Sequence, residues 1–150
     1  MTKVLLRPAL PGDEPYLRWL EEACMRDYAV ALWGSWRPRP ANALILSEHR
    51  IMVADEKDVG CVSLFRRDDH LWVNKLYVAP GHQKRGYGAV VLKQVMEEAR
   101  AIGLPLRLSV LTTNPAVAFY RREGLRIYAE TVERRYMTSE AQADSHTPPG

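Results

Sequence analysis

The sequence predicts one α+β domain, in which a central mixed, mostly antiparallel sheet is flanked by helices. Residues 49–78 contain three β-rich segments in a row, joined by polar hairpin signals, as in an antiparallel meander. From residue 88 the chain alternates helical and strand-like segments up to residue 138. A chain of 150 residues, 47% apolar and 26% charged, is large enough for one core and too short for two typical domains.

The amino-terminal part contains a short strand and a helix. Residues 4–7 are apolar and stop at a proline, and Asp13 is the expected N-cap of the helix that follows. Residues 28–36 are aromatic and weakly helical, and residues 37–40 have the composition of an extended linker. The helix is indicated by apolar residues at helical spacing, namely Leu17, Leu20 and Cys24.

The meander follows the linker. Its strands are residues 51–54, 59–65 and 71–78, and the polar segments 55–58 and 68–69 form the two hairpin turns. With the first strand, this makes four. Alternation along the last of them predicts that Tyr77 lies on one face and that the opposite face carries Trp72, Asn74, Leu76 and Val78.

The carboxy-terminal part alternates helices and strands. The helix 88–102 has apolar residues three and four apart and ends at Gly103. Asn114 as N-cap and Pro115 at the first helical position begin a second helix, which Gly124 ends with a left-handed cap. Strands are expected at residues 106–111, 125–131 and 133–138.

Composition and charge exclude several classes of protein. Lys and Arg number 21 against 18 Asp and Glu, and the net charge of +3 is too small for a dedicated nucleic-acid binder. No apolar run approaches the ~20 residues that span a bilayer, and no signal peptide is visible, so we expect a cytoplasmic protein without a membrane partner. Cys24 and Cys61 have neither disulfide-scaffold nor metal-ligand spacing; we expect inert buried thiols and no metal. The polar residues 139–150 are expected to be a disordered tail, which leaves a single domain of residues 1–138.

The most informative segment is the turn between the last meander strand and the helix after it, which contains Gly81, Gly86 and Gly88. Glycines let backbone N–H groups approach a ligand closely, and the helix start adds a partial positive charge. Lys84 and Arg85 add full positive charges. The turn therefore predicts a binding site for a phosphate or pyrophosphate.

Two familiar glycine motifs do not fit this turn. The chain has no Gly-Lys-Ser/Thr, as a P-loop requires, and Val91 stands where a dinucleotide fingerprint needs its last glycine. The turn reads Gln83-x-x-Gly86-x-Gly88, which resembles the acyl-CoA signature Q/R-x-x-G-x-G/A of the GNAT superfamily of acetyl-CoA-dependent N-acetyltransferases. The resemblance extends over about residues 3–138, through Leu6-Arg7-Pro8-Ala9, Gly12-Asp13, Leu76-Tyr77-Val78-Ala79-Pro80, and Asn114-x-x-x-Ala118-Phe119-Tyr120-x-x-x-Gly124-Leu125.

The resemblance implies acetyl-CoA as cosubstrate and a role for each matching position. The strand edge at Leu76, Tyr77 and Val78 would pair with the pantetheine arm, and an N–H of Val78 or its neighbour would polarise the thioester carbonyl. Asn114 and Phe119 would complete the pantetheine side. The pyrophosphate would be held by backbone amides of Gln83, Lys84, Arg85, Gly86, Tyr87, Gly88 and Ala89.

The resemblance also implies that Tyr120 faces the sulfur and protonates the departing thiolate. A phenol titrates near ~10 and a thiol near ~8.5, so this donation needs only the right geometry. The alternative is that Phe119 and Tyr120 simply pack the helix onto the sheet.

The general base is not assigned. Family members often place a carboxylate on the strand before the glycine turn, whereas this strand offers only Asn74, which could orient a water but cannot take a proton. Other candidates without geometry are Glu22, Asp68, Asp69 and His70.

The acceptor is also open: a small-molecule amine or a peptide amino group is implied, and a homodimer is allowed. Tyr28, Trp33 and Trp36 either wall the acceptor site or complete a core. The pairs Arg121-Arg122 and Arg134-Arg135 are expected to be solvated. The alternative functions are a non-catalytic CoA-binding sensor or interaction module on the same fold and, with less support, a nucleic-acid binder.

Overall fold

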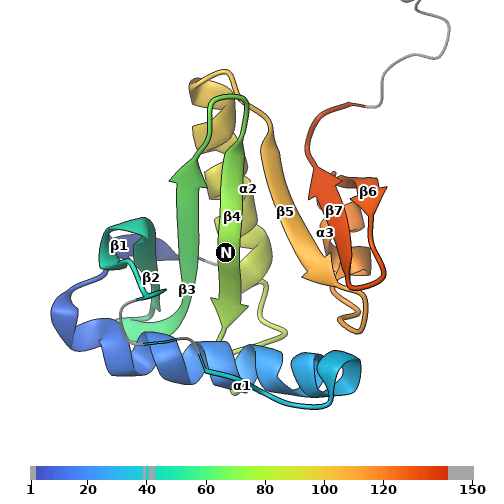
Figure 1. Ribbon diagram of the computed structural model, residues 1–150. Helices are drawn as coiled ribbons and strands as arrows, with labels where there is room; N and C mark the ends of the chain where they lie inside the picture. The colour runs from blue at the N-terminus through green and yellow to red at the C-terminus, as the bar shows by residue number, and fades with distance from the viewer. Residues whose placement is uncertain (1–2, 39, 41–42, 142–150) are drawn as a thin grey trace, which may run out of the picture.

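The computed structural model describes residues 3–38, 40 and 43–141, and its centre is a seven-stranded sheet in the order β1-β2-β3-β4-β5-β7-β6 (Figure 1). Every neighbouring pair is antiparallel except β4 and β5, which are parallel. The predicted α+β class with a mixed, mostly antiparallel sheet is therefore confirmed. The strands are β1 (Leu5–Pro8), β2 (His49–Ala54), β3 (Lys57–Arg66), β4 (Leu71–Val78), β5 (Leu106–Leu111), β6 (Arg126–Glu130) and β7 (Arg134–Thr138).

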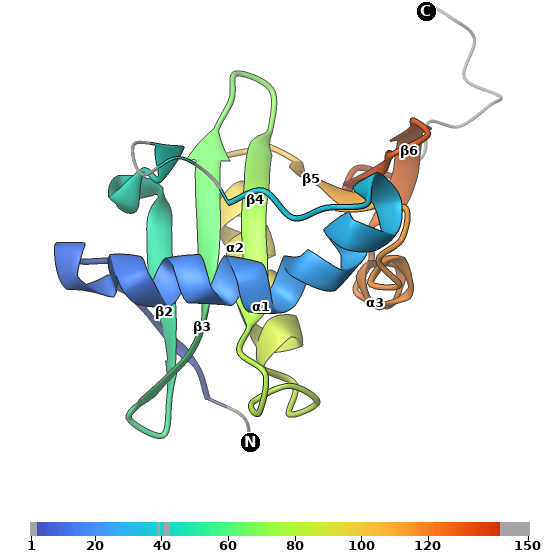
Figure 2. The ribbon, with the colours of Figure 1, turned by 60° about the horizontal axis from the view of Figure 1, so that its bottom comes forward.

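Three α-helices flank the sheet. Helix α1 (Glu14–Trp33) lies across one face, while α2 (Tyr87–Ala101) and α3 (Val117–Arg122) lie against the other (Figures 1 and 2). Two short 3-10 turns, η1 (Pro11–Asp13) and η3 (Leu46–Glu48), precede α1 and β2. Residues 28–33, part of the segment that the sequence predicts to be weakly helical, continue α1 to Trp33, and Gly34 ends the helix with a φ of 79°.

Each face of the sheet has its own buried cluster. The larger cluster lies under α2 and α3 and includes Val91, Val95 and Leu108. The smaller one lies under α1 and includes Leu17 and Leu20, as their helical spacing predicts. Within the described residues, no helix combines the length and the apolar character needed to cross a membrane.

Local contacts differ from expectation at the start of α1. Asp13 stands at the N-cap position but makes no side-chain cap bond to α1, because η1 runs directly into the helix. Its carboxylate instead accepts hydrogen bonds from both terminal nitrogens of Arg7, at 2.8 and 2.9 Å, and from the N–H of Leu10 at 2.8 Å. Asp13 therefore ties β1 to the start of α1.

Strand β4 contains a bulge that corrects the predicted faces. Ser63 pairs with Lys75 and Leu64 with Val73, so Asn74 is the extra residue on β4. Beyond it, the alternation changes phase: Leu76 and Val78 pack into the α2 cluster together with Leu71 and Val73, while Tyr77 packs under α1. The prediction that Trp72 shares a face with Leu76 and Val78 is wrong, because one inserted residue exchanges the two faces.

The same region of β4 separates from β5. The parallel pairing covers only Leu71–Val73 against Leu106–Leu108, and beyond it the strands diverge (Figure 1). In the described part of the chain, β4 from Asn74 to Val78 therefore has no strand partner on the side of β5.

Ser139, the first residue after β7 and of the predicted tail, is held against the sheet. Ser139 and Leu106 are joined by two hydrogen bonds of 2.9 Å, one between backbones and one from the Leu106 N–H to Ser139 Oγ. The rest of the predicted tail, residues 142–150, lies outside the described residues.

Candidate functional site

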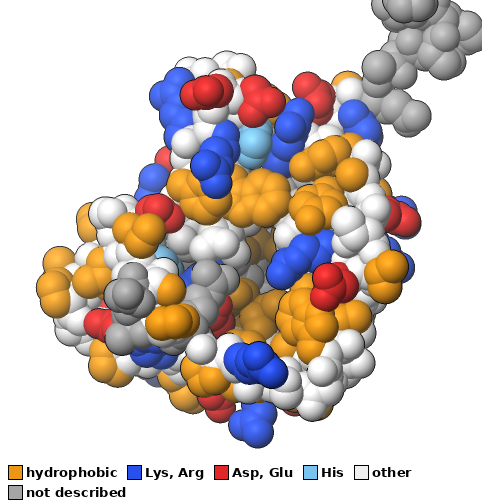
Figure 3. Space-filling model, in the orientation of Figure 1, with side chains coloured by type: hydrophobic (Ala, Val, Ile, Leu, Met, Phe, Trp, Pro, Cys, Tyr) orange, Lys and Arg blue, Asp and Glu red, His pale blue; other side chains and the backbone are white. Residues whose placement is uncertain are grey.

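A cavity of about 580 Å³ occupies the gap between β4 and β5. Figure 3 shows the hollow near the middle of this face, bordered by hydrophobic and basic side chains. The cavity brings together seven of the residues that sequence predicts for the site: Asn74, Leu76, Tyr77, Val78, Gln83, Asn114 and Tyr120.

Helix α1 spans the gap and is tied to both sides of it (Figure 2). On the β4 side, Cys24 Sγ donates to the Val78 carbonyl at 3.4 Å. On the β5 side, Thr113 Oγ1, just past the strand, donates to the Tyr28 carbonyl at 2.7 Å. The helix therefore closes one end of the cavity. Burial raises the pKa of the Cys24 thiol to about 11, so this thiol is protonated and inert although it lines the cavity.

The free edge of β4 presents backbone groups to the cavity. The Val78 carbonyl accepts from Gln83 Nε2 at 2.9 Å as well as from Cys24, and neither residue belongs to β3. In a strand, the N–H and C=O of one residue point to the same edge. Val78 and, two residues earlier, Leu76 therefore direct their N–H groups away from β3 and towards the gap.

The glycine turn lies next to the cavity and joins it through Gln83. Gly81, Lys84 and Gly86 have φ values of 93°, 65° and 83°, which coil the chain tightly before α2 begins. The N–H groups of a helix's first turn have no intrahelical acceptor, so α2 offers them to a ligand. The remaining predicted ligands do not line the cavity itself but belong to this turn or pack behind it: Lys84, Arg85, Gly86, Tyr87, Gly88, Ala89 and Phe119.

Gly88 is placed where the turn meets α3. A Cβ there would lie 3.6 Å from Phe119 Cζ and 3.8 Å from Val78 Cγ2. Phe119 in turn meets the Tyr120 ring edge to face at 5.1 Å. Phe119 is therefore a packing residue that connects the glycine turn to the tyrosine.

Tyr120 lines the cavity from α3 and is half-buried. No residue in the described part of the chain hydrogen-bonds to its hydroxyl group. Burial raises the pKa of Tyr120 to about 12, so the hydroxyl keeps its proton at every physiological pH. Asn114 lines the same cavity, and its Oδ1 accepts from the Ala116 N–H at 3.0 Å in the turn before α3; the N-cap of α3 is Ala116 and not Asn114, so that prediction is wrong because the helix begins two residues later.

The carboxylates proposed from sequence as bases do not reach the cavity. Asp69 is bound to His70 at 2.7 Å at the tip of the hairpin between β3 and β4, and Asp68 lies beside it in that turn. Glu22 accepts from the Trp36 indole at 3.1 Å. None of them lines the cavity.

Glu21 is the carboxylate that sequence analysis missed. It is 8% exposed, lines the cavity from α1, and lies 3.9 Å from the Nζ of Lys75, which is buried on β4. Of the described residues, it is the only Asp or Glu on the cavity wall. The spacing of α1 could have indicated it, because Glu21 is four residues after Leu17 and one after Leu20 and therefore lies on the buried face of the helix.

The aromatic residues near the end of α1 line the cavity. Tyr28, Trp33 and Trp36 do so from one side, and Trp72 and Tyr136 from the sheet. The structure thus brings the three predicted residues together on one wall. Two of them donate indole hydrogen bonds to carboxylates: Trp36 to Glu22, and Trp33 to Glu133, which directly precedes β7.

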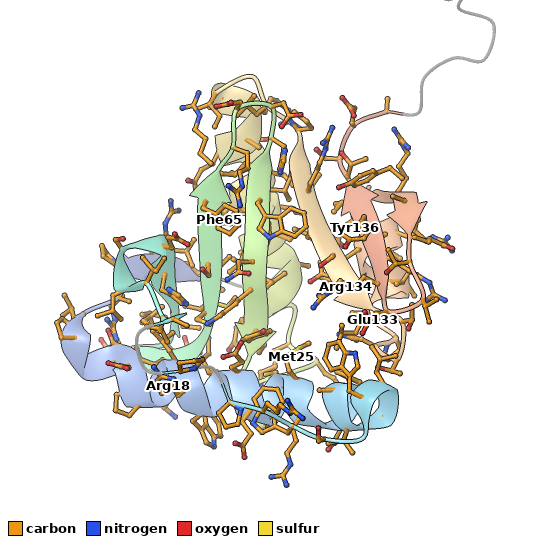
Figure 4. The ribbon with its side chains drawn as sticks, viewed as in Figure 1. Arg18, Met25, Phe65, Glu133, Arg134 and Tyr136 are labelled. Carbon is orange, nitrogen blue, oxygen red and sulfur yellow. The ribbon has the colours of Figure 1, made fainter. Side chains whose placement is uncertain are left out.

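Arg134, which is predicted to be solvated, is half-buried and lines the cavity. Its Nη1 donates to Ser109 Oγ on β5 at 3.3 Å, so the side chain reaches across β5 from β7 (Figure 4). Arg135, the next residue, lies on the other face of the strand and is 4.0 Å from Glu130. Strand alternation separates the two arginines into different environments.

Three comparisons with known proteins agree with this geometry. The family model described as "Acetyltransferase (GNAT) domain" matches residues 47–126, more than half of the chain. The chain is similar to the uncharacterized N-acetyltransferase YjcF of Bacillus subtilis, with 29% identity over 84 residues, which is 56% of this chain and 59% of the relative.

Two solved structures share the fold. The PaiA N-acetyltransferase of Thermoplasma acidophilum, in complex with coenzyme A, has a TM-score of 0.74 and 14% identity, over 93% of this chain and 99% of that one. N-acetylglutamate synthase of Neisseria gonorrhoeae, complexed with coenzyme A and N-acetyl-glutamate, has a TM-score of 0.70 and 22% identity, over 92% of this chain but only 35% of that one. The matched family model covers the meander, the opened pair β4 and β5, the glycine turn and the tyrosine, and the chain belongs to the GNAT acetyltransferase family.

Proposed function

We propose that this chain transfers an acetyl group from acetyl-CoA to an amine by direct attack. The observation that carries the proposal is the gap between β4 and β5, where one cavity receives a free strand edge, a glycine turn at a helix start and a tyrosine hydroxyl. The coenzyme A in the solved structures named above supports this choice of cosubstrate.

The cosubstrate fits the donor set of the chain. The N–H groups of residues 83–89 and the charges of Lys84 and Arg85 suit a pyrophosphate. The N–H groups of Leu76 and Val78, which point away from β3 towards the gap, suit the amides of the pantetheine arm and the thioester carbonyl. Asn114, which also lines the cavity, would border the same arm.

The chemistry needs one proton removed and one supplied. The amine nitrogen bonds to the acetyl carbon, the carbon–sulfur bond breaks, the amine loses a proton and the sulfur gains one. Tyr120 is the proton donor in this proposal, because its hydroxyl lines the cavity, stays protonated and has no competing partner among the described residues.

Glu21 is the proposed proton acceptor. Among the described residues it is the only Asp or Glu that lines the cavity, and a carboxylate is a usual general base. Asn74, at the bulge, would orient the amine or a water between the amine and Glu21.

The first experiment is a thermal-shift titration with acetyl-CoA, CoA, NAD and an oligonucleotide. A ligand at 100 times its Kd adds about 2.7 kcal/mol of stability, so acetyl-CoA and CoA should raise the Tm while NAD and the oligonucleotide should not. An unchanged Tm at saturating acetyl-CoA would refute the proposal. CoA release with a panel of amines then separates an enzyme from a non-catalytic CoA-binding module, which would bind without turnover.

A further inference from the structure

The cavity wall formed by β5 and β7 carries a positive charge that the protein leaves without a counter-charge. Arg134 is half-buried, and within the described residues its side chain makes one hydrogen bond, to Ser109 Oγ. Among the residues that the structure describes, no carboxylate lies within ion-pair distance of its guanidinium. That group has more N–H donors than one hydroxyl can occupy, so donors are left for a ligand.

This environment is unlike that of other arginines on the same sheet. Arg135 is paired with Glu130, and Arg107 on β5 lies within 3.4 Å of Glu140. Neither of these two arginines lines the cavity. A guanidinium that lacks a protein carboxylate and lines a cavity is suited to bind a carboxylate of the ligand with two parallel hydrogen bonds.

The surroundings of Arg134 strengthen the attraction. Its guanidinium lies over the Trp33 ring at 6.0 Å, and Tyr136, two residues along β7, also lines the cavity. Figure 4 shows Arg134 and Tyr136 on the same side of the hollow, with Met25 facing them from α1. Arg134 is half-buried beside these aromatic rings, and a charged hydrogen bond is stronger where the local dielectric is lower than in water.

The two sides of the gap carry different charged groups: Glu21 paired with Lys75 on one side, and Arg134, which has no ion pair among the described residues, on the other. Glu21 lies on the wall made by α1 and β4, next to the free strand edge, and Arg134 lies on the wall made by β5 and β7. An acceptor with an amino group and a carboxylate would place its nitrogen towards β4 and its carboxylate towards Arg134. A simple cationic amine would gain nothing from Arg134 and would be repelled by it.

We propose that the acceptor is a small amine that carries a carboxylate, that is, a free amino acid, and that Arg134 is the residue that recognises the carboxylate. The side chain of the amino acid lies against the aromatic wall. The cavity of about 580 Å³ has to hold both the acetylated arm and the acceptor, which favours an amino acid over a longer segment of chain. This inference rests on the proposed function and adds the class of acceptor to it.

The test compares acceptors with the same skeleton and different charge. For phenylalanine, leucine and glutamate, kcat/KM is measured with the free amino acid, its α-amide and its decarboxylated amine, and also with a tripeptide that begins with the same residue. The variants are Arg134→Gln, Arg134→Lys and the matched control Arg135→Gln. Comparing variants for each acceptor cancels the differences in amine basicity, because these are the same for every variant.

We expect Arg134→Gln to lower kcat/KM about 10- to 100-fold for the preferred free amino acid, the range for hydrogen bonds to a charged group. The kcat/KM values for the amides and the decarboxylated amines should change little in Arg134→Gln. Arg134→Lys should keep part of the kcat/KM for the free amino acid, and Arg135→Gln should match the wild type. The same loss for all acceptors, or a preference for amides, amines or peptides in the wild type, would overturn the inference while leaving acetyl transfer intact.

Acetyl-CoA binding, measured first for every variant, separates the two proposals. Arg134→Gln and Arg134→Lys should keep the acetyl-CoA thermal shift of the wild type, because Arg134 lies outside the glycine turn. A wild type without any acetyl-CoA shift would refute the proposed function together with this inference. An Arg134→Gln variant that loses the shift would mean that Arg134 serves the cosubstrate and not the acceptor.

Discussion

Replacing Tyr120 with phenylalanine tests the proposed proton donor without disturbing the fold. The change removes one hydroxyl, and no described residue hydrogen-bonds to that group. We therefore expect the free energy of unfolding to change by less than about 1 kcal/mol, because no protein hydrogen bond is lost. The edge-to-face contact with Phe119 needs only the ring and is retained.

The expected loss of rate follows from the pKa values. General acid catalysis contributes ~10²–10⁴-fold. Burial raises the pKa of Tyr120 to about 12, whereas a thiol titrates near ~8.5, so complete transfer to a fully hydrated thiolate is uphill by about 5 kcal/mol. The phenol then acts mainly by a hydrogen bond to the developing charge, and the effect of its removal should lie at the lower end, about 10²-fold in kcat.

The assay is release of CoA thiol at saturating acetyl-CoA with the preferred amine, followed from about pH 6 to pH 10. Because the pKa of Tyr120 is raised, its acid form persists over this range and the wild-type rate should show no fall from tyrosine ionisation. Tyr128→Phe, on the outer strand β6 and 39% exposed, is the matched control and should be fully active. A kcat for Tyr120→Phe within twofold of the wild type, with normal acetyl-CoA binding, would refute the role.

Three further predictions concern other parts of the molecule. Glu21→Gln should lower kcat/KM near pH 7 by about 10²-fold, and a pH–rate profile should show the activity recovering as the pH approaches the pKa of the amine. The same variant removes the carboxylate beside buried Lys75 and should lower the Tm, so a Glu21→Gln/Lys75→Met double variant should regain Tm but not activity. Gly86→Ala and Gly103→Ala each place an alanine at a positive φ, 83° and 73°, so urea unfolding should show a loss of about 1–2 kcal/mol of stability in both. Only Gly86→Ala should weaken acetyl-CoA binding, and equal binding by the two variants would argue against the glycine turn as the pyrophosphate site. The Arg7 guanidinium lowers the pKa of Asp13 from 3.8 to about 2, so the stabilisation by this pair is complete above pH 3.8 and is lost as the pH falls towards 2. Over that range the free energy of unfolding of the wild type should fall by about 1 kcal/mol more than that of Asp13→Asn, as measured by urea unfolding at each pH.

The sequence alone determined the order of elements and the chemistry of the glycine turn. Hairpin signals, helical spacing and glycine positions are local properties, and the structure has the strands of the meander and the helices α2 and α3 near their predicted positions. Gly86, Gly103 and Gly124 all adopt the positive φ expected of a turn or a helix end. The signature Gln83-x-x-Gly86-x-Gly88 is equally local, which is why it identifies the family without any knowledge of contacts.

Only the tertiary structure decided which side chains face the reacting groups. The bulge at Asn74 depends on how β4 pairs with β3, and the cavity depends on where β4 leaves β5. Glu21 and Arg134 lie more than one hundred residues apart in sequence, and they become opposite walls of one cavity only when α1 and β7 are placed on either side of that gap. Strand register and helix docking are set by long-range packing, in which a shift of one residue exchanges the faces of a strand, so the base and the acceptor site were decided by the assembled sheet.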